Sequence, residues 1–172
     1  VFDSPHSGTD YPADFDFTCP IGLLREAEDL YVEELFDAAP AFGAGLLCAL
    51  VPRSYIDPNR AVDDIDMELI EGSWPGRLGP AERSPYGMGL IRRMGRPGEP
   101  IYGRRLTVAE VRHRIDRYYQ PYHDTLAAMI EERRRQFGMV YHVSCHSMPS
   151  GPMHPGVGQP YRPQSDFVLG DR

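Results

Sequence analysis

Apolar positions along the chain fall into blocks that predict alternating strands and helices. Residues 45–51 form a continuous apolar run flanked by glycine and proline, which is typical of a strand buried on both faces. Residues 139–145 have the same character and predict a second buried strand, while Val1 and Phe2 predict the end of an earlier one. Each of these segments is too short to be a stable helix, so strands are the better prediction.

In the segments between the predicted strands, apolar residues recur at the spacing of an α-helix. Asp29 is a favourable N-cap for an amphipathic helix whose apolar positions recur up to Phe36. A capping box at residues 107–110 opens a longer helical pattern that ends at Gly138, and Pro121 either kinks this helix or opens a second one. The order strand, helix, strand predicts an α/β fold with a mostly parallel, mixed sheet.

Composition and charge narrow the class of protein. The 172 residues suffice for one compact domain, and the formal net charge of −7 makes a nucleic-acid partner unexpected. All 18 basic residues are arginine, which excludes Schiff-base chemistry on lysine and a Walker A phosphate loop. The longest apolar stretch is far shorter than the roughly 20 residues of a membrane helix. The three cysteines form no CxxC pair, so we expect a cytoplasmic protein with reduced thiols and no membrane partner.

Two histidines follow predicted strands at equivalent positions. His6-Ser7 comes after the first strand, and His146-Ser147 comes after the strand that ends at Cys145. Ligands of open α/β sheets bind at the carboxyl ends of the strands, so both histidines are expected at one cleft. Two histidines with a carboxylate form a usual ligand set for catalytic zinc, so we predict one divalent metal ion between His6 and His146.

The loop after residues 45–51 carries a candidate carboxylate clamp. Residues 53–60 read Arg-Ser-Tyr-Ile-Asp-Pro-Asn-Arg, and an arginine fork beside an asparagine suits a carboxylate group. The alternative is that Asp57 and Arg60 form only a surface pair in an Asx-type turn. Spacing alone does not separate these two interpretations.

These segments together resemble the N-formylglutamate amidohydrolase family. The matching segments run in order along the chain: residues 5–8, Glu28-Asp29, residues 53–60, Ile101-Tyr102, residues 119–123, residues 145–150 and residues 166–172. The resemblance implies a single domain over residues 1–172 with a three-layer, phosphorylase/hydrolase-like α/β sandwich, distantly similar to zinc carboxypeptidases. It also implies zinc-dependent cleavage of N-formyl-L-glutamate, a small acidic N-acyl amino acid, to formate and glutamate in histidine degradation.

The resemblance also implies roles for individual residues. His6 and His146 are the expected zinc ligands, and Thr9 stands where carboxypeptidases have a glutamate ligand. We therefore choose Asp29 as the third ligand, with Glu28 as its competitor and a plain N-cap as its alternative role. Asn59 and Arg60 are expected to bind a substrate carboxylate, Ser147 to contact substrate, and Arg53 to stabilise the oxyanion.

The C-terminal end of the chain and the absence of an assigned general base leave alternative functions open. Family members continue beyond the segment that ends at Arg172, and the general base is expected there, so we expect the chain to be incomplete at its C-terminus. A related zinc hydrolase of another N-acyl amino acid or of a carboxypeptidase-like substrate is one alternative. A metal- or carboxylate-binding module without catalysis is another. The oligomeric state is left open.

Remaining polar clusters have simpler expected roles. Residues 63–66 lack the spacing of a calcium loop and predict an exposed acidic turn. Residues 133–135 predict a solvated helix face with local ion pairs. We expect His142 to be buried and hydrogen-bonded, His113 and His123 to be surface or packing residues, and His154 to lie in a glycine- and proline-rich tail.

Overall fold

The computed structural model, which describes residues 1–148 and 167–170, is built on a small parallel sheet. Strands β1 (Phe2–Ser4), β2 (Leu46–Cys48) and β7 (Val143–Ser144) lie in the order β2-β1-β7. The register pairs Phe2 with both Leu46 and Val143. All three strands therefore deliver their carboxyl ends to the same edge of the sheet.

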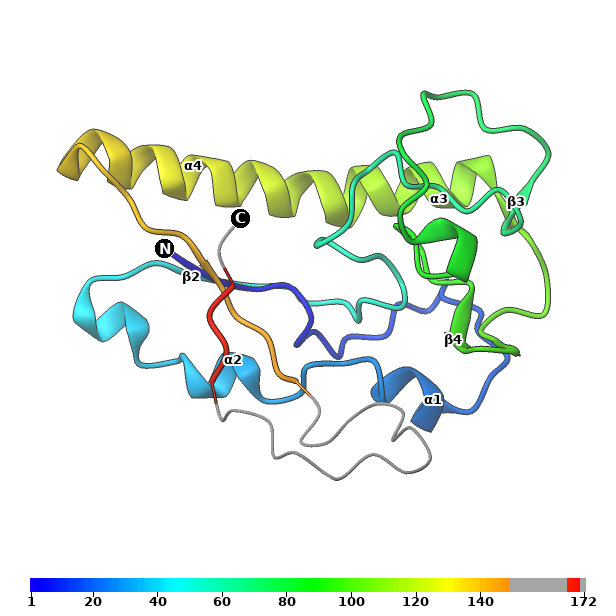
Figure 1. Cartoon of the computed structure of the whole chain (residues 1–172), viewed down its shortest axis with the longest axis horizontal. Coiled ribbons are helices and arrows are strands. Elements are labelled where there is room, and N and C mark those ends of the chain that lie inside the picture. The colour runs from blue at the N-terminus through cyan, green and yellow to red at the C-terminus, as the bar shows by residue number, and fades with distance from the viewer. Residues whose placement is uncertain (149–166, 171–172) are drawn as a thin grey trace, which may run out of the picture.

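Helices lie on both sides of these strands (Figure 1). On one side, α3 (Val108–Arg114), a five-residue π-turn (Ile115–Tyr119) and α4 (Gln120–Phe137) form one long rod. On the other side lie the short helices α1 (Ile21–Arg25) and α2 (Val32–Leu35). The predicted α/β class is confirmed.

Local sequence signals set the limits of the long rod. Thr107 accepts the backbone N–H of Glu110, and the Glu110 carboxylate accepts the backbone N–H of Thr107, which is the predicted capping box. Pro121 lies in the first turn of α4, directly after the π-turn, and the helical backbone runs through it without a break. Gly138 ends α4 in the left-handed conformation, with φ of 79°.

Two smaller pairings and two short 3₁₀ turns complete the described elements. Strands β3 (Ile70–Glu71) and β6 (Leu106–Thr107) pair in parallel, and β4 (Met94–Arg96) pairs antiparallel with β5 (Glu99–Pro100). The 3₁₀ turns are η1 (Ala39–Phe42) and η2 (Ser84–Tyr86). None of the helices in the described part of the chain is long and apolar enough to cross a membrane.

Three predicted elements are shorter or less buried than expected. Strand β2 is only partly buried and β7 is exposed, because each flanks β1 on one side and has no further neighbour among the described residues. The helix expected from Asp29 is only the four-residue α2, preceded by Tyr31 in the left-handed conformation with φ of 67°. Asp29 is therefore not its N-cap.

The hydrophobic core lies mainly between α3 and the loops that follow β2. Its fully buried members include Phe15, Leu24, Tyr55, Ile56, Leu90, Ile101, Leu106 and Val111. The buried guanidinium of Arg114 lies 4.0 Å from the centre of the Tyr55 ring, and its Nη1 donates to the Tyr102 hydroxyl. This core fixes the loop that carries residues 53–60.

Polar side chains on the long rod tie it to the sheet and to that loop. The Tyr122 hydroxyl donates to Asp3 Oδ2 at 2.6 Å, and the Tyr119 hydroxyl donates to the Arg60 carbonyl at 2.8 Å. His123 Nε2 lies 2.9 Å from the Pro58 carbonyl oxygen, which makes it a packing residue, as expected. The motif at residues 119–123 thus positions the loop after β2.

The structure also places the remaining histidines and the arginine-rich segment at residues 133–135. His142 is hydrogen-bonded to Asp3 Oδ1 at 2.8 Å, but its side chain is 35% exposed, so the expected burial is wrong. His113 is a surface residue, as expected. Arg134 and Arg135 are exposed and pair with Glu131 and Glu132, which confirms the solvated face. His154 lies outside the described residues.

Candidate metal centre

His6 and His146 meet where β1 and β7 end. The two strands are parallel neighbours, with Asp3 opposite Ser144, and each histidine lies two residues beyond its strand. Their ring centroids are 4.7 Å apart. His6 is buried, whereas His146 keeps an exposed edge. The structure therefore brings together two imidazoles that are 140 residues apart in sequence.

Asp29 completes a cluster of three candidate ligands. Its Oδ2 lies 3.3 Å from His6 Nδ1 and 3.0 Å from His146 Nδ1. One donor atom from each of the three residues lies within 4.8 Å of the others, so the cluster can hold a metal ion. Two imidazole nitrogens and one carboxylate oxygen form a donor set that suits a divalent metal with an open coordination position.

Local backbone geometry explains why Asp29 faces the histidines. The Asp29 N–H donates to the His6 carbonyl at 3.0 Å, which ties the segment before α2 to the loop after β1. Ser147 Oγ donates to Asp29 Oδ1 at 3.2 Å and orients the carboxylate from the other side. Ser147 thus contacts the cluster itself.

Glu28 lies outside this cluster. Its carboxylate accepts a hydrogen bond from the Tyr11 hydroxyl, while Oε2 is buried without a partner among the described residues. Burial raises the pKa of Glu28 above its ordinary value, although Tyr11 and Arg25 oppose the shift. Of the two acidic neighbours, Asp29 is the one that contacts the histidines.

Asp57 lies behind His6 and is a site residue that the sequence did not indicate. It is fully buried, and its Oδ1 lies 2.8 Å from His6 Nε2. Arg53 donates to Asp57 Oδ2 from Nε at 3.1 Å and from Nη2 at 2.8 Å. The Asn59 N–H also donates to Asp57 Oδ1, so the Asx-type turn of the alternative interpretation is present. The surface pair of that interpretation is contradicted, because Asp57 is fully buried.

The electrostatics of the cluster keep both aspartates charged. Burial by itself would raise the pKa of Asp29, but hydrogen bonds from His146 and His6 outweigh it and hold that pKa below its ordinary value. Burial likewise opposes ionisation of Asp57, and His6 together with Arg53 lowers its pKa below the ordinary value. Two ionised carboxylates beside two imidazoles are well suited to a cation.

The predicted clamp residues lie beside the cluster. Asn59 Nδ2 is 3.3 Å from His146 Nε2. The Arg60 guanidinium donates from Nε to the Met88 carbonyl and from Nη1 to the Asn59 carbonyl. Arg53 is held by its ion pair with Asp57. Residues 53–60 therefore lie against the three candidate metal ligands, in the loop that follows β2.

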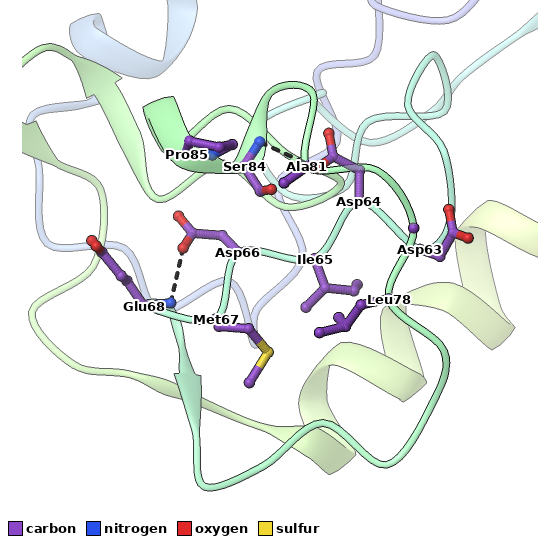
Figure 2. Close-up of a pocket in the computed structure, with 11 residues that line it drawn as sticks. Asp63, Asp64, Ile65, Asp66, Met67, Glu68, Leu78, Ala81, Ser84 and Pro85 are labelled. Carbon is purple, nitrogen blue, oxygen red and sulfur yellow. Dashed lines mark hydrogen bonds between the residues drawn. The ribbon is translucent and has the colours of Figure 1, made fainter.

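The acidic run at residues 63–66 has a different role from the exposed turn predicted. Asp64 and Asp66 are buried and line a cavity of about 240 Å³ (Figure 2). Asp64 accepts the backbone N–H groups of Arg83 and Ser84, and Asp66 accepts the Glu68 N–H and Arg93 Nε. Each carboxylate accepts hydrogen bonds from groups in other loop segments, so Asp64 and Asp66 hold these loops together.

Comparisons with known proteins agree on one family. A family model described as N-formylglutamate amidohydrolase matches residues 1–172. An N-formylglutamate deformylase of Pseudomonas putida is 31% identical over 156 aligned residues, and the match covers 87% of this chain and 51% of that protein. A crystal structure of N-formylglutamate amidohydrolase from Ralstonia eutropha matches with a TM-score of 0.84 and 50% identity, covering 87% of this chain and 53% of the other. The chain thus spans about half the length of these relatives. By this evidence, the chain belongs to the N-formylglutamate amidohydrolase family.

Proposed function

We propose that this protein is a zinc-dependent amidohydrolase that cleaves N-formyl-L-glutamate to formate and glutamate. The observation that carries the proposal is the convergence of His6, Asp29 and His146, with the buried Asp57 behind His6. The names of the matched relatives support the substrate.

We further propose that residues 1–172 form a single domain of a three-layer, zinc-carboxypeptidase-like sandwich. The helices on both sides of a parallel sheet support this architecture. Three free thiols, Cys19, Cys48 and Cys145, support the proposed cytoplasmic location, because reduced cysteines are usual in that compartment.

The ligand set fits zinc in a specific way. If His6 Nε2 carries its proton and donates to Asp57, the lone pair of Nδ1 is directed toward Asp29 and His146. His6, Asp29 and His146 would hold the ion, and a bound zinc supplies a Lewis acid and lowers the pKa of bound water to about 7. Asp57 fixes the tautomer of His6 and keeps its ring oriented.

The remaining residues bind and orient the substrate. Asn59 and Arg60 hold a substrate carboxylate beside the cluster, where Asn59 already contacts His146. Arg53 lies next to His6 through Asp57 and stabilises the developing negative charge on the amide oxygen. Ser147 contacts both the substrate and Asp29. A locally positive rim around the cluster attracts a dicarboxylate despite the net charge of −7.

Metal analysis together with a formate assay tests the proposal. His6→Ala and His146→Ala should each lose most of the bound zinc and release little formate from N-formyl-L-glutamate. His113→Ala, on the exposed surface, is the matched control and should retain both properties. Full zinc occupancy in either variant would remove that histidine from the site. Zinc binding without formate release from any N-acyl amino acid would favour a non-catalytic binding module.

A further inference from the structure

Arg92 is a buried cation without a partner among residues 1–148 and 167–170. The residue is 8% exposed, and its Nε is buried with no hydrogen bond in this part of the chain. No described carboxylate pairs with it, whereas the adjacent Arg93 pairs with Asp66 and Glu68. Burying an unpaired charge is costly, so a ligand that supplied the missing negative charge would be bound favourably here.

The backbone around Arg92 is attached directly to the candidate site. The Asp57 N–H donates to the Leu90 carbonyl at 2.8 Å, and Arg60 Nε donates to the Met88 carbonyl at 3.2 Å. A backbone bridge between Met88 and Arg92 closes this short segment. Arg92 is therefore held against the loop that carries Asp57 and Arg60.

The charges around Arg92 favour an anionic ligand. Burial and, to a smaller extent, the positive charge of Arg53 lower the pKa of Arg92 to about 10, while Asp57 opposes the shift. At neutral pH the guanidinium stays charged. Of the other arginines at this site, Arg53 donates to Asp57, and Arg60 belongs to the clamp proposed for the first carboxylate. Arg92 thus offers a guanidinium fork, which matches a carboxylate with two parallel hydrogen bonds.

We propose that Arg92 binds the side-chain carboxylate of the substrate and makes the site selective for N-acyl derivatives of acidic amino acids. This inference rests on the proposed function. Asn59 contacts His146, so the Asn59–Arg60 clamp lies beside the metal cluster and receives the α-carboxylate, which is the closer one to the scissile amide. Arg92 then receives the second carboxylate.

The test compares two substrates that differ only in the distal group. N-Formyl-L-glutamate carries the second carboxylate, and N-formyl-L-glutamine replaces it by a neutral amide of the same shape. In the zinc-loaded full chain, Arg92→Met should lower kcat/KM for N-formyl-L-glutamate by about 10–100-fold, mostly through KM, the size expected for losing hydrogen bonds to a charged group. The value for N-formyl-L-glutamine should change by less than about threefold, so the preference of the natural protein disappears.

Two further variants complete the design. Arg92→Lys keeps the positive charge but loses the bidentate guanidinium, so it should retain only part of the preference for N-formyl-L-glutamate over N-formyl-L-glutamine. This variant also serves as the test if Arg92→Met does not fold. Arg96→Met removes an exposed arginine paired with Glu26 on the same segment and should leave both substrates unaffected. Equal losses on both substrates, or an unchanged preference, would overturn the proposal.

A binding measurement separates this inference from the proposed function. If the natural protein releases formate from neither substrate, the proposed function fails. Calorimetric titration with glutarate then tests the anion site alone, because glutarate carries two carboxylates and no scissile bond. Weaker binding of glutarate by Arg92→Lys supports the anion site, whereas equal binding by the variant and the natural protein contradicts it.

Discussion

At the scale of single residues, the candidate metal centre depends on the buried carboxylate of Asp57. This carboxylate contacts Nε2 of His6, whereas Nδ1 of His6 is the nitrogen that faces Asp29. Asp57 contacts His6 Nε2 on one side and Arg53 on the other, and it also caps its own turn through the Asn59 N–H. These contacts hold the His6 ring, the Arg53 guanidinium and the clamp loop in one arrangement. Its effect on a bound metal ion is therefore indirect, through the orientation and basicity of His6.

We predict that Asp57→Asn weakens zinc binding by about 10–100-fold, the usual effect of losing such a partner of a ligating histidine. Competition with a chromogenic chelator measures the affinity. Asp63→Asn, on a partly exposed carboxylate nearby in the chain, is the control and should bind zinc normally. Unchanged affinity in Asp57→Asn would show that His6 does not depend on this carboxylate.

Arg60 supplies a second prediction at this scale. Arg60→Lys keeps the positive charge but cannot form the planar, bidentate hydrogen bonds of a guanidinium group. The free energy of substrate binding should therefore become less favourable by about 1.5–3 kcal/mol. The KM for N-formyl-L-glutamate reports the loss. An unchanged KM would show that Arg60 does not contact a carboxylate and serves only to join the Met88 and Asn59 carbonyls.

At the scale of elements, the start of α3 concentrates the best-defined local interactions. Glu110 completes the capping box with Thr107 and also pairs with Arg104. The hydrogen bond from Arg104 is the main reason that the pKa of Glu110 falls from 4.5 to about 2. A depressed folded-state pKa means that the carboxylate stabilises the fold fully above about pH 4.5 and progressively less as the pH falls toward 2.

We therefore predict that Glu110→Gln lowers the free energy of unfolding at neutral pH, because the amide keeps the cap but loses the charge. The difference from the natural protein should shrink as the pH falls below about 4.5, since the natural carboxylate is then protonated. Urea unfolding at about pH 6 and about pH 3 measures it. Glu82→Gln, on an exposed loop, is the control. A difference that stays constant with pH would contradict the role assigned to the charge.

At the scale of the whole molecule, polar contacts between distant segments join the long rod to the sheet. Tyr122 on α4 donates to the buried Asp3 on β1, and His142 contacts the other oxygen of the same carboxylate. The sheet itself joins residues near both ends of the described chain, because β1 pairs with β7. These contacts hold the strand that presents His6 next to the strand that presents His146.

We predict that Tyr122→Phe lowers the free energy of unfolding by about 1–3 kcal/mol, because a buried acceptor loses a partner and no solvent replaces it. Thermal and urea unfolding measure the effect. Tyr141→Phe, whose side chain is 75% exposed, is the control and should be neutral. Equal stability of Tyr122→Phe and the natural protein would show that water satisfies Asp3 instead.

Features that depend on local patterns or on a general rule of topology could be predicted from the amino-acid sequence. The capping box at Thr107 and Glu110 and the left-handed end at Gly138 need only neighbouring residues, so their patterns predicted them. The meeting of His6 with His146 followed from a rule, since parallel strands end at one edge of their sheet.

Which charged groups are buried, and which partners they contact, depends instead on how distant segments pack together. By local pattern Asp29 was an N-cap, and only the family resemblance made it a candidate ligand. Asp57 was half of a surface pair in one of two open interpretations, and residues 63–66 were an expected exposed turn. Asp29, Asp57, Asp64 and Asp66 are all buried. Their partners lie between 2 and 118 residues away, and no periodic pattern encodes the distant pairs. The direction of a loop side chain depends on backbone angles and on the core packed behind it. The burial of Arg92 beside Asp57 was therefore decided by the fold and could not be read from local sequence.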